Sequence, residues 1–321
     1  MPLPAELCDA VLDYLHADPE TLRSTALVCR SWVRTSRLHS FSSLSLSLSN
    51  PPAASFSATP RPHTPETAAF RAIALDGLLA SPLETISPSI HSLEVRDTLA
   101  PVRLRWGDRP VMTAMATLLQ LVPRLAFLPS VKTLRLSELC WPLLRSLGGR
   151  VAHLYLATGA VCLGGNLPKL LAALPRLQTL ELDGVAGIPL RFWSPKLSAP
   201  AQSFVSPLHT LTIRHSSIAF LPWLSNAVAP NLSTLKIDGL VSYELEYLET
   251  YLLAPRVGAT LRVLELAFLS QHVDAEELEP ILEPCSALQT LIVRGEELTL
   301  PNASTEKSML VPSVKTAAIN W

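Results

Sequence analysis

The chain has 321 residues, of which 48% are hydrophobic and 17% are charged, and its formal net charge is -1. This composition excludes a disordered chain, because enough apolar surface is present to bury a large core. The near-zero net charge excludes a global electrostatic field that would attract nucleic acid or an anionic membrane, and we expect neither as a partner.

The first 41 residues predict three short helices. Pro4 stands where the first residue of a helix is favoured, and Asp18 followed by Pro19 is typical of the start of a second helix. In the first helix, apolar residues are spaced to share one face: Leu7, Val11, Leu12 and Leu15. A third helix is expected over the phrase WVRTSRL. A module of about forty residues is small for independent stability, so we expect it to bury apolar surface against a partner.

Two phrases of this module, LPAELCDAVLDYL and LRSTALVCRSWVRTSRLHSF, closely resemble the F-box domain. The matching residues are Leu3, Pro4, Glu6 and Leu7 at its opening, Val11, Leu12 and Leu15 in its first helix, Leu27, Val28, Cys29, Arg30 and Trp32 in its most specific phrase, and Arg37 and Phe41 at its end. The resemblance defines a first domain over residues 1–41.

The resemblance to F-box domains implies a partner. Such domains bind the S-phase-kinase-associated adaptor of SCF ubiquitin ligases and thereby join its cullin. The positions that resemble those contacting the adaptor or supporting that surface are Leu3, Pro4, Leu7, Val11, Leu12, Val28 and Trp32. An apolar helical face that is offered to a partner is physically sensible, because exposed apolar patches of this kind mark binding sites.

Two other functions of this module stay open. Cys29 could be a reactive thiol, but its apolar helical context beside Val28 favours a packed thiol. Arg30, Arg34 and Arg37 could hold phosphates, but their spacing favours one solvated stripe along a helix.

Residues 42–85 are expected to connect the first domain to the rest of the chain. Leucines alternate with serines in FSSLSLSLS, which predicts a strand that pairs with the following sheet. Residues 50–63, rich in Pro, Ser and Ala, predict a flexible loop. Its Thr-Pro pair, Thr59-Pro60, is either a phosphorylation site or part of a plain connector. The phrase TPE after this loop predicts the start of a helix that ends near Leu79.

A repeated eight-residue phrase dominates residues 86–321. It reads apolar-x-x-Leu-x-apolar and occurs as IHSLEVRD, VKTLRLSE, VAHLYLAT, LQTLELDG, LHTLTIRH, LSTLKIDG, LRVLELAF, LQTLIVRG and a weaker VKTAAINW. In a strand, successive side chains point to opposite faces, so the leucines would face a core and the residues between them would face solvent. Parallel strands need crossover connections, and intervening segments such as VDAEELEPILEPC carry helix signals.

The repeated phrase resembles the leucine-rich repeats of intracellular proteins. This resemblance implies an α/β solenoid, with a curved parallel sheet and helices on its convex side. EPCSALQTLIV resembles the cysteine-bearing form of the repeat, which implies that Cys285 is a packing residue. A doubly wound α/β enzyme is the alternative fold, but such a sheet would not reuse one phrase throughout.

No sequence motif points to catalysis or to a cofactor. A P-loop, Gly-x-Gly-x-x-Gly, Gly-x-Ser-x-Gly and His-Glu-x-x-His are all absent from the sequence. The five cysteines are far apart and include no Cys-x-x-Cys, which argues against a disulfide framework or a zinc site and favours a reducing compartment. Because these motifs are missing, we expect a non-enzymatic protein without a cofactor. Because no secretory signal or bilayer-spanning stretch is visible, we expect it in the cytoplasm or the nucleus.

Residues that alternate with the repeat leucines are candidates for contact with a target protein. They are Glu94, Arg96, Arg135, Tyr155, Glu181, Asp183, Arg214, Lys236, Asp238, Glu265 and Arg294. Asp183, Arg214 and Asp238 are expected to be lateral neighbours on adjacent strands. They either pair with one another or read a ligand.

Together these patterns predict a non-catalytic substrate-recognition subunit of an SCF-type ubiquitin ligase. The F-box would dock on the adaptor, and the repeats would recruit a target whose identity the sequence does not give. The alternative is a leucine-rich-repeat scaffold for protein binding without a ligase. A third class is an enzyme whose site has no recognised motif.

Overall fold

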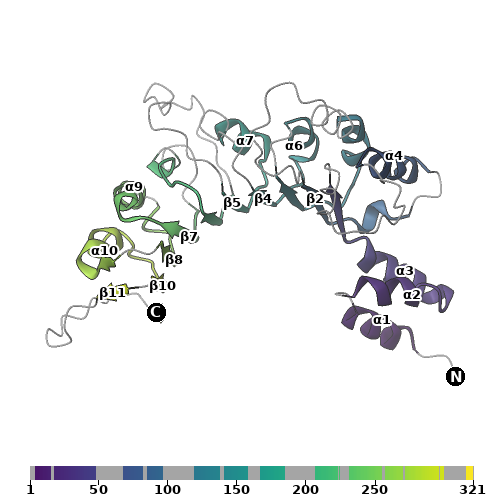
Figure 1. Cartoon of the computed structure of the whole chain (residues 1–321), viewed down its shortest axis with the longest axis horizontal. Coiled ribbons are helices and arrows are strands. Elements are labelled where there is room, and N and C mark those ends of the chain that lie inside the picture. Colours follow the sequence, from purple (N-terminus) through teal and green to yellow (C-terminus); the bar gives the residue numbers. More distant parts are fainter. Residues whose placement is uncertain are drawn as a thin grey trace, which may run out of the picture. The chain divides into compact units, whose positions relative to one another are not determined.

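Short helices and parallel strands make up the chain in its computed structural model (Figure 1). The structure describes residues 4–15, 18–47, 68–81, 85–96, 119–137, 141–157, 167–184, 207–222, 224, 231–254, 257–269, 272–295, 297–299 and 316–320. The chain divides into two compact units, Met1–Val151 and Ala152–Trp321.

The first unit begins with the three predicted helices, which are confirmed as α1 (Ala5–Tyr14), α2 (Pro19–Thr25) and α3 (Arg30–Ser40). Helix α3 packs against both α1 and α2 (Figure 1). The predicted cap of α2 is also confirmed, because the Asp18 carboxylate accepts hydrogen bonds from the backbone N–H groups of Glu20 and Thr21, both at 3.1 Å. We call α1, α2 and α3 together the helical module.

A parallel sheet follows the helical module within the first unit. Its strands are β1 (Ser43–Ser47), β2 (Ser92–Arg96) and β3 (Thr133–Leu136), in chain order. Its helices are α4 (Ala68–Leu79), the 3-10 helix η1 (Ser87–Ser89), a helical segment over 119–125, and α6 (Trp141–Leu147). The pairing of β1 with β2 confirms the strand predicted from the Leu-Ser alternation. The predicted loop over 50–63 lies outside the described residues.

The second unit repeats one strand and one connection. The strands of its main sheet are β4 (His153–Ala157), β5 (Thr179–Asp183), β6 (Thr210–Arg214), β7 (Thr234–Leu240), β8 (Val263–Phe268), β10 (Thr290–Arg294) and β12 (Thr316–Asn320). All neighbours are parallel and follow chain order. The connections contain α7 (Leu167–Ala173), η4 (Ser242–Glu244), α9 (Leu245–Leu252) and α10 (Ala275–Leu282). Two short strands, β9 (His272–Asp274) and β11 (Glu297–Thr299), pair with each other.

Each of the nine repeated phrases contains a strand, β2 to β8, β10 or β12, as predicted. The sheet of the second unit is open and parallel, and Figure 1 places α7, α9 and α10 on the same side of it. This is the repeat-like α/β arrangement expected of leucine-rich repeats. The predicted helix VDAEELEPILEPC is confirmed by α10.

Rows of leucine form the core of the second unit. Leu180, Leu211, Leu235 and Leu264 are direct neighbours on β5 to β8, and each has 0% of its surface exposed. Burial of each such side chain stabilises the fold by about 1.5–3 kcal/mol. Cys285 is also fully buried, and burial raises the pKa of its thiol to about 11, so it packs as a neutral group.

Gly258 lies where successive repeats pack closely against each other. A Cβ atom at this position would lie 2.6 Å from the backbone oxygen of Pro284 and 2.8 Å from that of Leu252. We therefore expect Gly258→Ala to lower the free energy of unfolding by about 1–3 kcal/mol in urea denaturation. Gly77→Ala is the control, because a Cβ at Gly77 of α4 would meet nothing within 4 Å and should stabilise the chain by about 0.5–1 kcal/mol. Equal unfolding midpoints for the two variants would contradict this packing.

Candidate protein-binding surfaces

Helix α1 exposes apolar side chains on its outer side. Leu7, Val11 and Tyr14 are 54%, 48% and 88% exposed, and we call them the outer stripe. At about 100° per residue, they fall within an arc of about 60° on the helix. Leu27 and Val28, in the turn between α2 and α3, are also strongly exposed. With Leu38 of α3, which is 44% exposed, the small helical module presents six large apolar side chains to solvent.

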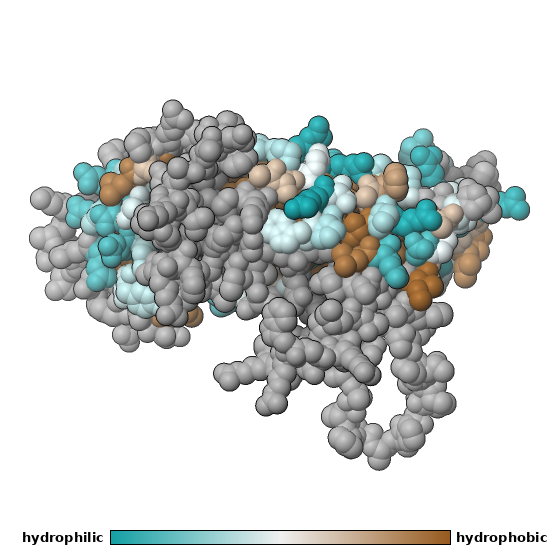
Figure 2. Space-filling model, turned by 90° about the horizontal axis from the view of Figure 1, so that it is seen from above, coloured by the Kyte–Doolittle hydropathy of each residue, from teal (hydrophilic) through white to brown (hydrophobic). Residues whose placement is uncertain are grey.

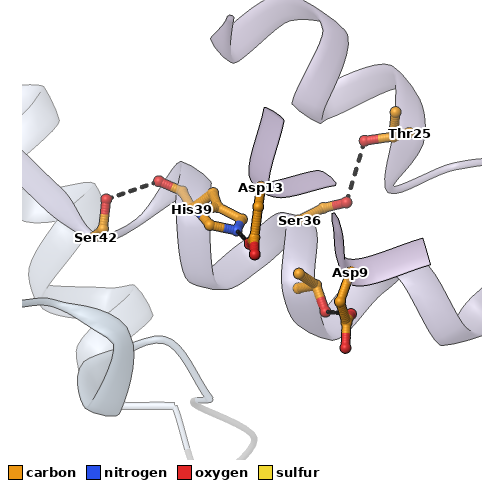
Figure 3. A network of polar contacts seen from close by, with 7 residues as sticks. Asp9, Asp13, Thr25, Ser36, His39 and Ser42 are labelled. Atoms are coloured by element: carbon orange, nitrogen blue, oxygen red, sulfur yellow. Dashed lines mark hydrogen bonds and ion pairs between the residues drawn. The ribbon is translucent and has the colours of Figure 1, made fainter. Parts of the chain in front are cut away.

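Two polar contacts join α1 to α3, and both are made by exposed aspartates of α1. The Thr35 hydroxyl donates to the Asp9 carboxylate at 2.7 Å, and the His39 Nε2 and Asp13 Oδ1 atoms lie 2.7 Å apart (Figure 3). Leu12 is the one fully buried side chain among the described side chains of α1.

The contact between α2 and α3 includes a polar pair as well. The Thr25 and Ser36 hydroxyls lie 3.1 Å apart, and both residues are buried (Figure 3). Each hydroxyl thus has a partner where water is excluded.

The residues predicted to form the adaptor-binding surface differ in how exposed they are. Pro4, Leu7, Val11 and Val28 are exposed, and Trp32 is half-buried. Leu3 lies outside the described residues. Leu12 is fully buried and so does not share the exposed face of Leu7 and Val11 as predicted; of the two expected roles, it fits support of the surface and not contact with a partner.

Cys29 is also a correction. It is exposed at the residue that precedes α3 rather than packed, and the Ser31 hydroxyl, 3.0 Å from its sulfur, lowers the pKa of its thiol. Sequence spacing placed it inside a helix, whereas α3 begins one residue later. The arginine prediction is confirmed, since Arg30, Arg34 and Arg37 are all exposed.

Exposed apolar side chains of the first unit also lie outside the helical module. They include Ile73 and Leu78 of α4 together with Leu119 and Phe127. An ion pair between Asp76 and Arg124, at 3.4 Å, joins these two regions. Figure 2 shows hydrophobic residues in separate groups between hydrophilic ones, and not as one continuous patch.

The eleven candidate target-facing residues all lie on the strand face opposite the buried leucines. The burial patterns of β2, β3 and β4 alternate between buried and exposed or half-buried positions, as the sequence predicts. In the first unit, Arg96 pairs with Glu94 of its own strand at 2.8 Å, and Arg135 is exposed.

Asp183 is the centre of a polar cluster on β4, β5 and the end of β6. Its Oδ2 atom accepts a hydrogen bond from the Tyr155 hydroxyl at 2.9 Å, and its Oδ1 atom lies 3.2 Å from His215 Nδ1. The pKa of Tyr155 is raised to about 12, first by burial and then by the hydrogen bond to Asp183 and its negative charge. Both carboxylate oxygens of Asp183 are thus occupied within the chain.

The charged residues of the second unit pair across neighbouring strands. Arg214 contacts Glu181 at 2.9 Å, and Glu265 bridges Lys236 at 3.0 Å and Arg294 at 2.8 Å. Asp183, Arg214 and Asp238 are lateral neighbours as predicted. However, Arg214 pairs with Glu181 instead, because its side chain reaches diagonally along the sheet. Charges on this face are therefore largely neutralised within the chain.

His215 is a member of this cluster that sequence reasoning did not select. Its φ of 47° makes it the one non-glycine residue with positive φ in the described part of the chain. Its backbone N–H donates to the Asp238 carbonyl at 2.9 Å, so neighbouring strands hold it in this strained conformation. Its place as the last residue of the phrase LHTLTIRH was the available signal, but only the strand register brings it close to Asp183.

The described ranges also bear on membrane spanning and metal binding. No helix there has the length and apolarity to cross a membrane. Within the same residues, no three His, Cys, Asp or Glu side chains come together as ligands for a metal ion.

Comparison with known proteins gives no functional relative. No protein-family model matches the chain, and no curated protein matches it. Among solved structures, a Bacteroides fragilis protein from a structural genomics programme is 12% identical, with 77% of this chain and 68% of that chain covered and a TM-score of 0.35. A similarity this low carries no argument about fold or function.

Asp183→Asn tests the polar cluster through the titration of Tyr155. We expect the variant to lower the pKa of Tyr155 below about 12 but to keep it above 10, since burial, the largest cause, is unchanged. Tyrosinate absorbance during alkaline titration measures this pKa, as the difference between each protein and its Tyr155→Phe version. In the parent chain, stability should fall as pH rises from 10 through about 12, because the unfolded state releases this proton first. An unchanged pKa of Tyr155 in Asp183→Asn would contradict the assigned contact.

Proposed function

We propose that this chain is the substrate-recognition subunit of an SCF-type ubiquitin ligase. The helical module would dock on the S-phase-kinase-associated adaptor, and through it on the cullin, while the repeats recruit a target protein. The observation that carries the proposal is the outer stripe together with Leu27 and Val28. Large apolar side chains gathered on so small a module are unfavourable in water and mark a surface for a protein partner.

The way in which the helical module joins the first sheet supports a role as a bridge. Only Phe41 and Ser42 separate α3 from β1. The Arg37 guanidinium donates to the Thr85 hydroxyl at 3.1 Å, and α3 packs against η1. A protein docked on the module would therefore be held at a defined position relative to β1 and β2, and not on a long flexible tether.

The strand face of the repeats is the proposed surface for the target. It presents half-exposed side chains on neighbouring parallel strands, such as Tyr155, Arg214 and Lys236. Because most charges there are paired within the chain, we expect the target to be recognised by shape and hydrogen bonds more than by long-range attraction.

The proposed mechanism is proximity. The chain itself forms no bond to ubiquitin, and the associated enzymes carry out the transfer. Holding a target beside them converts an encounter between separate molecules into one within a complex, which raises the effective concentration of the target. This activity belongs in the cytoplasm or the nucleus.

A scaffold without a ligase is the competing function. The open repeat sheet suits this role equally well, because leucine-rich repeats bind proteins in many settings. The outer stripe distinguishes the two functions, since a scaffold that acts through its repeats alone has no need of it. Target binding by a chain that never joins the adaptor would favour the scaffold.

Leu7→Glu tests adaptor docking. A carboxylate at this position would be buried without a partner in an apolar interface, so we expect capture by the purified adaptor to weaken about tenfold or more. Leu253→Glu is the matched control, because Leu253 is 57% exposed against 54% for Leu7 but lies in the second unit. Circular dichroism would establish that both variants are folded. Equal capture of the two variants would count against docking through the outer stripe.

A further inference from the structure

The orientation of α1 opposes the usual preference of an amphipathic helix. Asp9 and Asp13 contact α3 although both are exposed, Asp13 at 65%, whereas the exposed side chains of Leu7, Val11 and Tyr14 lie on the other side of the helix. By helical geometry, the centre of the outer stripe lies roughly 150° from that of the two aspartates. The hydrophobic effect alone would turn the apolar side toward the neighbouring helix.

The side of α3 that faces α1 explains why the helix does not turn. It presents the Thr35 hydroxyl and the His39 ring, each 2.7 Å from an aspartate oxygen of α1 (Figure 3). His39 is only 17% exposed, so it has little access to water in place of its partner. If α1 turned by half a rotation, apolar side chains would cover both polar groups and leave them without these hydrogen bonds.

We infer that Asp9 and Asp13 are positioning residues that set the rotation of α1 and keep its outer stripe available to a partner. The Asp9–Thr35 and Asp13–His39 contacts are satisfied in one rotation of the helix only. Leu12, the one buried apolar side chain among those described in α1, lies on the same inner side and agrees with that rotation. The two contacts thus keep the outer stripe exposed to solvent, although exposure of its apolar side chains is unfavourable. The orientation itself does not depend on the proposed function, and only its consequence for adaptor docking rests on that function.

Thiol labelling measures the rotation directly. The parent background is Cys8→Ser, and Leu7→Cys and Leu12→Cys are introduced separately, with iodoacetamide labelling followed by peptide mass spectrometry. We expect fast labelling at position 7 and slow labelling at position 12. Adding Asp9→Leu with Asp13→Leu removes both contacts and makes the inner side apolar. Labelling at position 7 should then slow by at least about tenfold as the helix turns.

Two controls separate positioning from a general effect on folding. Glu20→Leu removes an exposed acidic side chain of α2 and should leave labelling at both positions unchanged. Asp13→His combined with His39→Asp exchanges the partners of one pair and should retain fast labelling at position 7 and slow labelling at position 12. Loss of this pattern in the exchanged pair would count against a positioning role.

The outcomes that overturn the inference are distinct from failure of adaptor docking. Fast labelling at position 7 in the Asp9→Leu, Asp13→Leu protein means that the contacts do not set the rotation. Fast labelling at both positions means that α1 has detached without turning, which also overturns the inference. Neither readout involves the adaptor. If the helix turns as expected, adaptor capture should fall at least about tenfold as well, and unchanged capture would remove the link to docking alone.

Discussion

Side chains alternate between the two faces of each parallel strand, and this alternation determines what the repeats can bury and what they can offer to another protein. Leu180, Leu211, Leu235 and Leu264 form one continuous buried row because their strands are paired in register. A shift of one residue in any strand would place leucine in water and charge in the core. The same register brings Asp183 beside Tyr155 and His215, and Glu265 between Lys236 and Arg294. The strand register that buries the leucines therefore also determines which polar side chains meet on the opposite face.

The helical module differs from the repeats in how much of its apolar surface it buries. Among the described side chains of α1, only Leu12 is buried, and the contact of α1 with α3 includes two hydrogen-bonded polar pairs. Apolar side chains of the kind that the repeats bury are here exposed. This contrast underlies the proposal of two surfaces with separate roles. One is apolar and suited to permanent docking, and the other is polar and self-paired and suited to selective recognition.

The sequence predicted the strands far better than the contacts between side chains. A phrase with period two recurs throughout, and each copy forms a strand, because alternation and repetition are local signals. Which charges would pair was not predictable, since the choice of Glu181 over Asp183 or Asp238 by Arg214 depends on how a long side chain crosses the sheet. Helical spacing identified the apolar residues of α1 but not which side would face α3. Leu12 was therefore grouped with Leu7 and Val11 on one face, although it is buried and they are exposed. The exposure of Cys29 was missed because it depends on where α3 begins.

The central claim is that a second protein completes the apolar face of the helical module. Calorimetric titration of the intact chain with purified adaptor, repeated at several temperatures, tests it most directly. Burial of apolar surface makes the heat capacity change of binding negative. The account predicts saturable binding of one adaptor per chain, with a binding enthalpy that becomes more negative as temperature rises. Absence of binding, or binding whose enthalpy does not change with temperature, would contradict it.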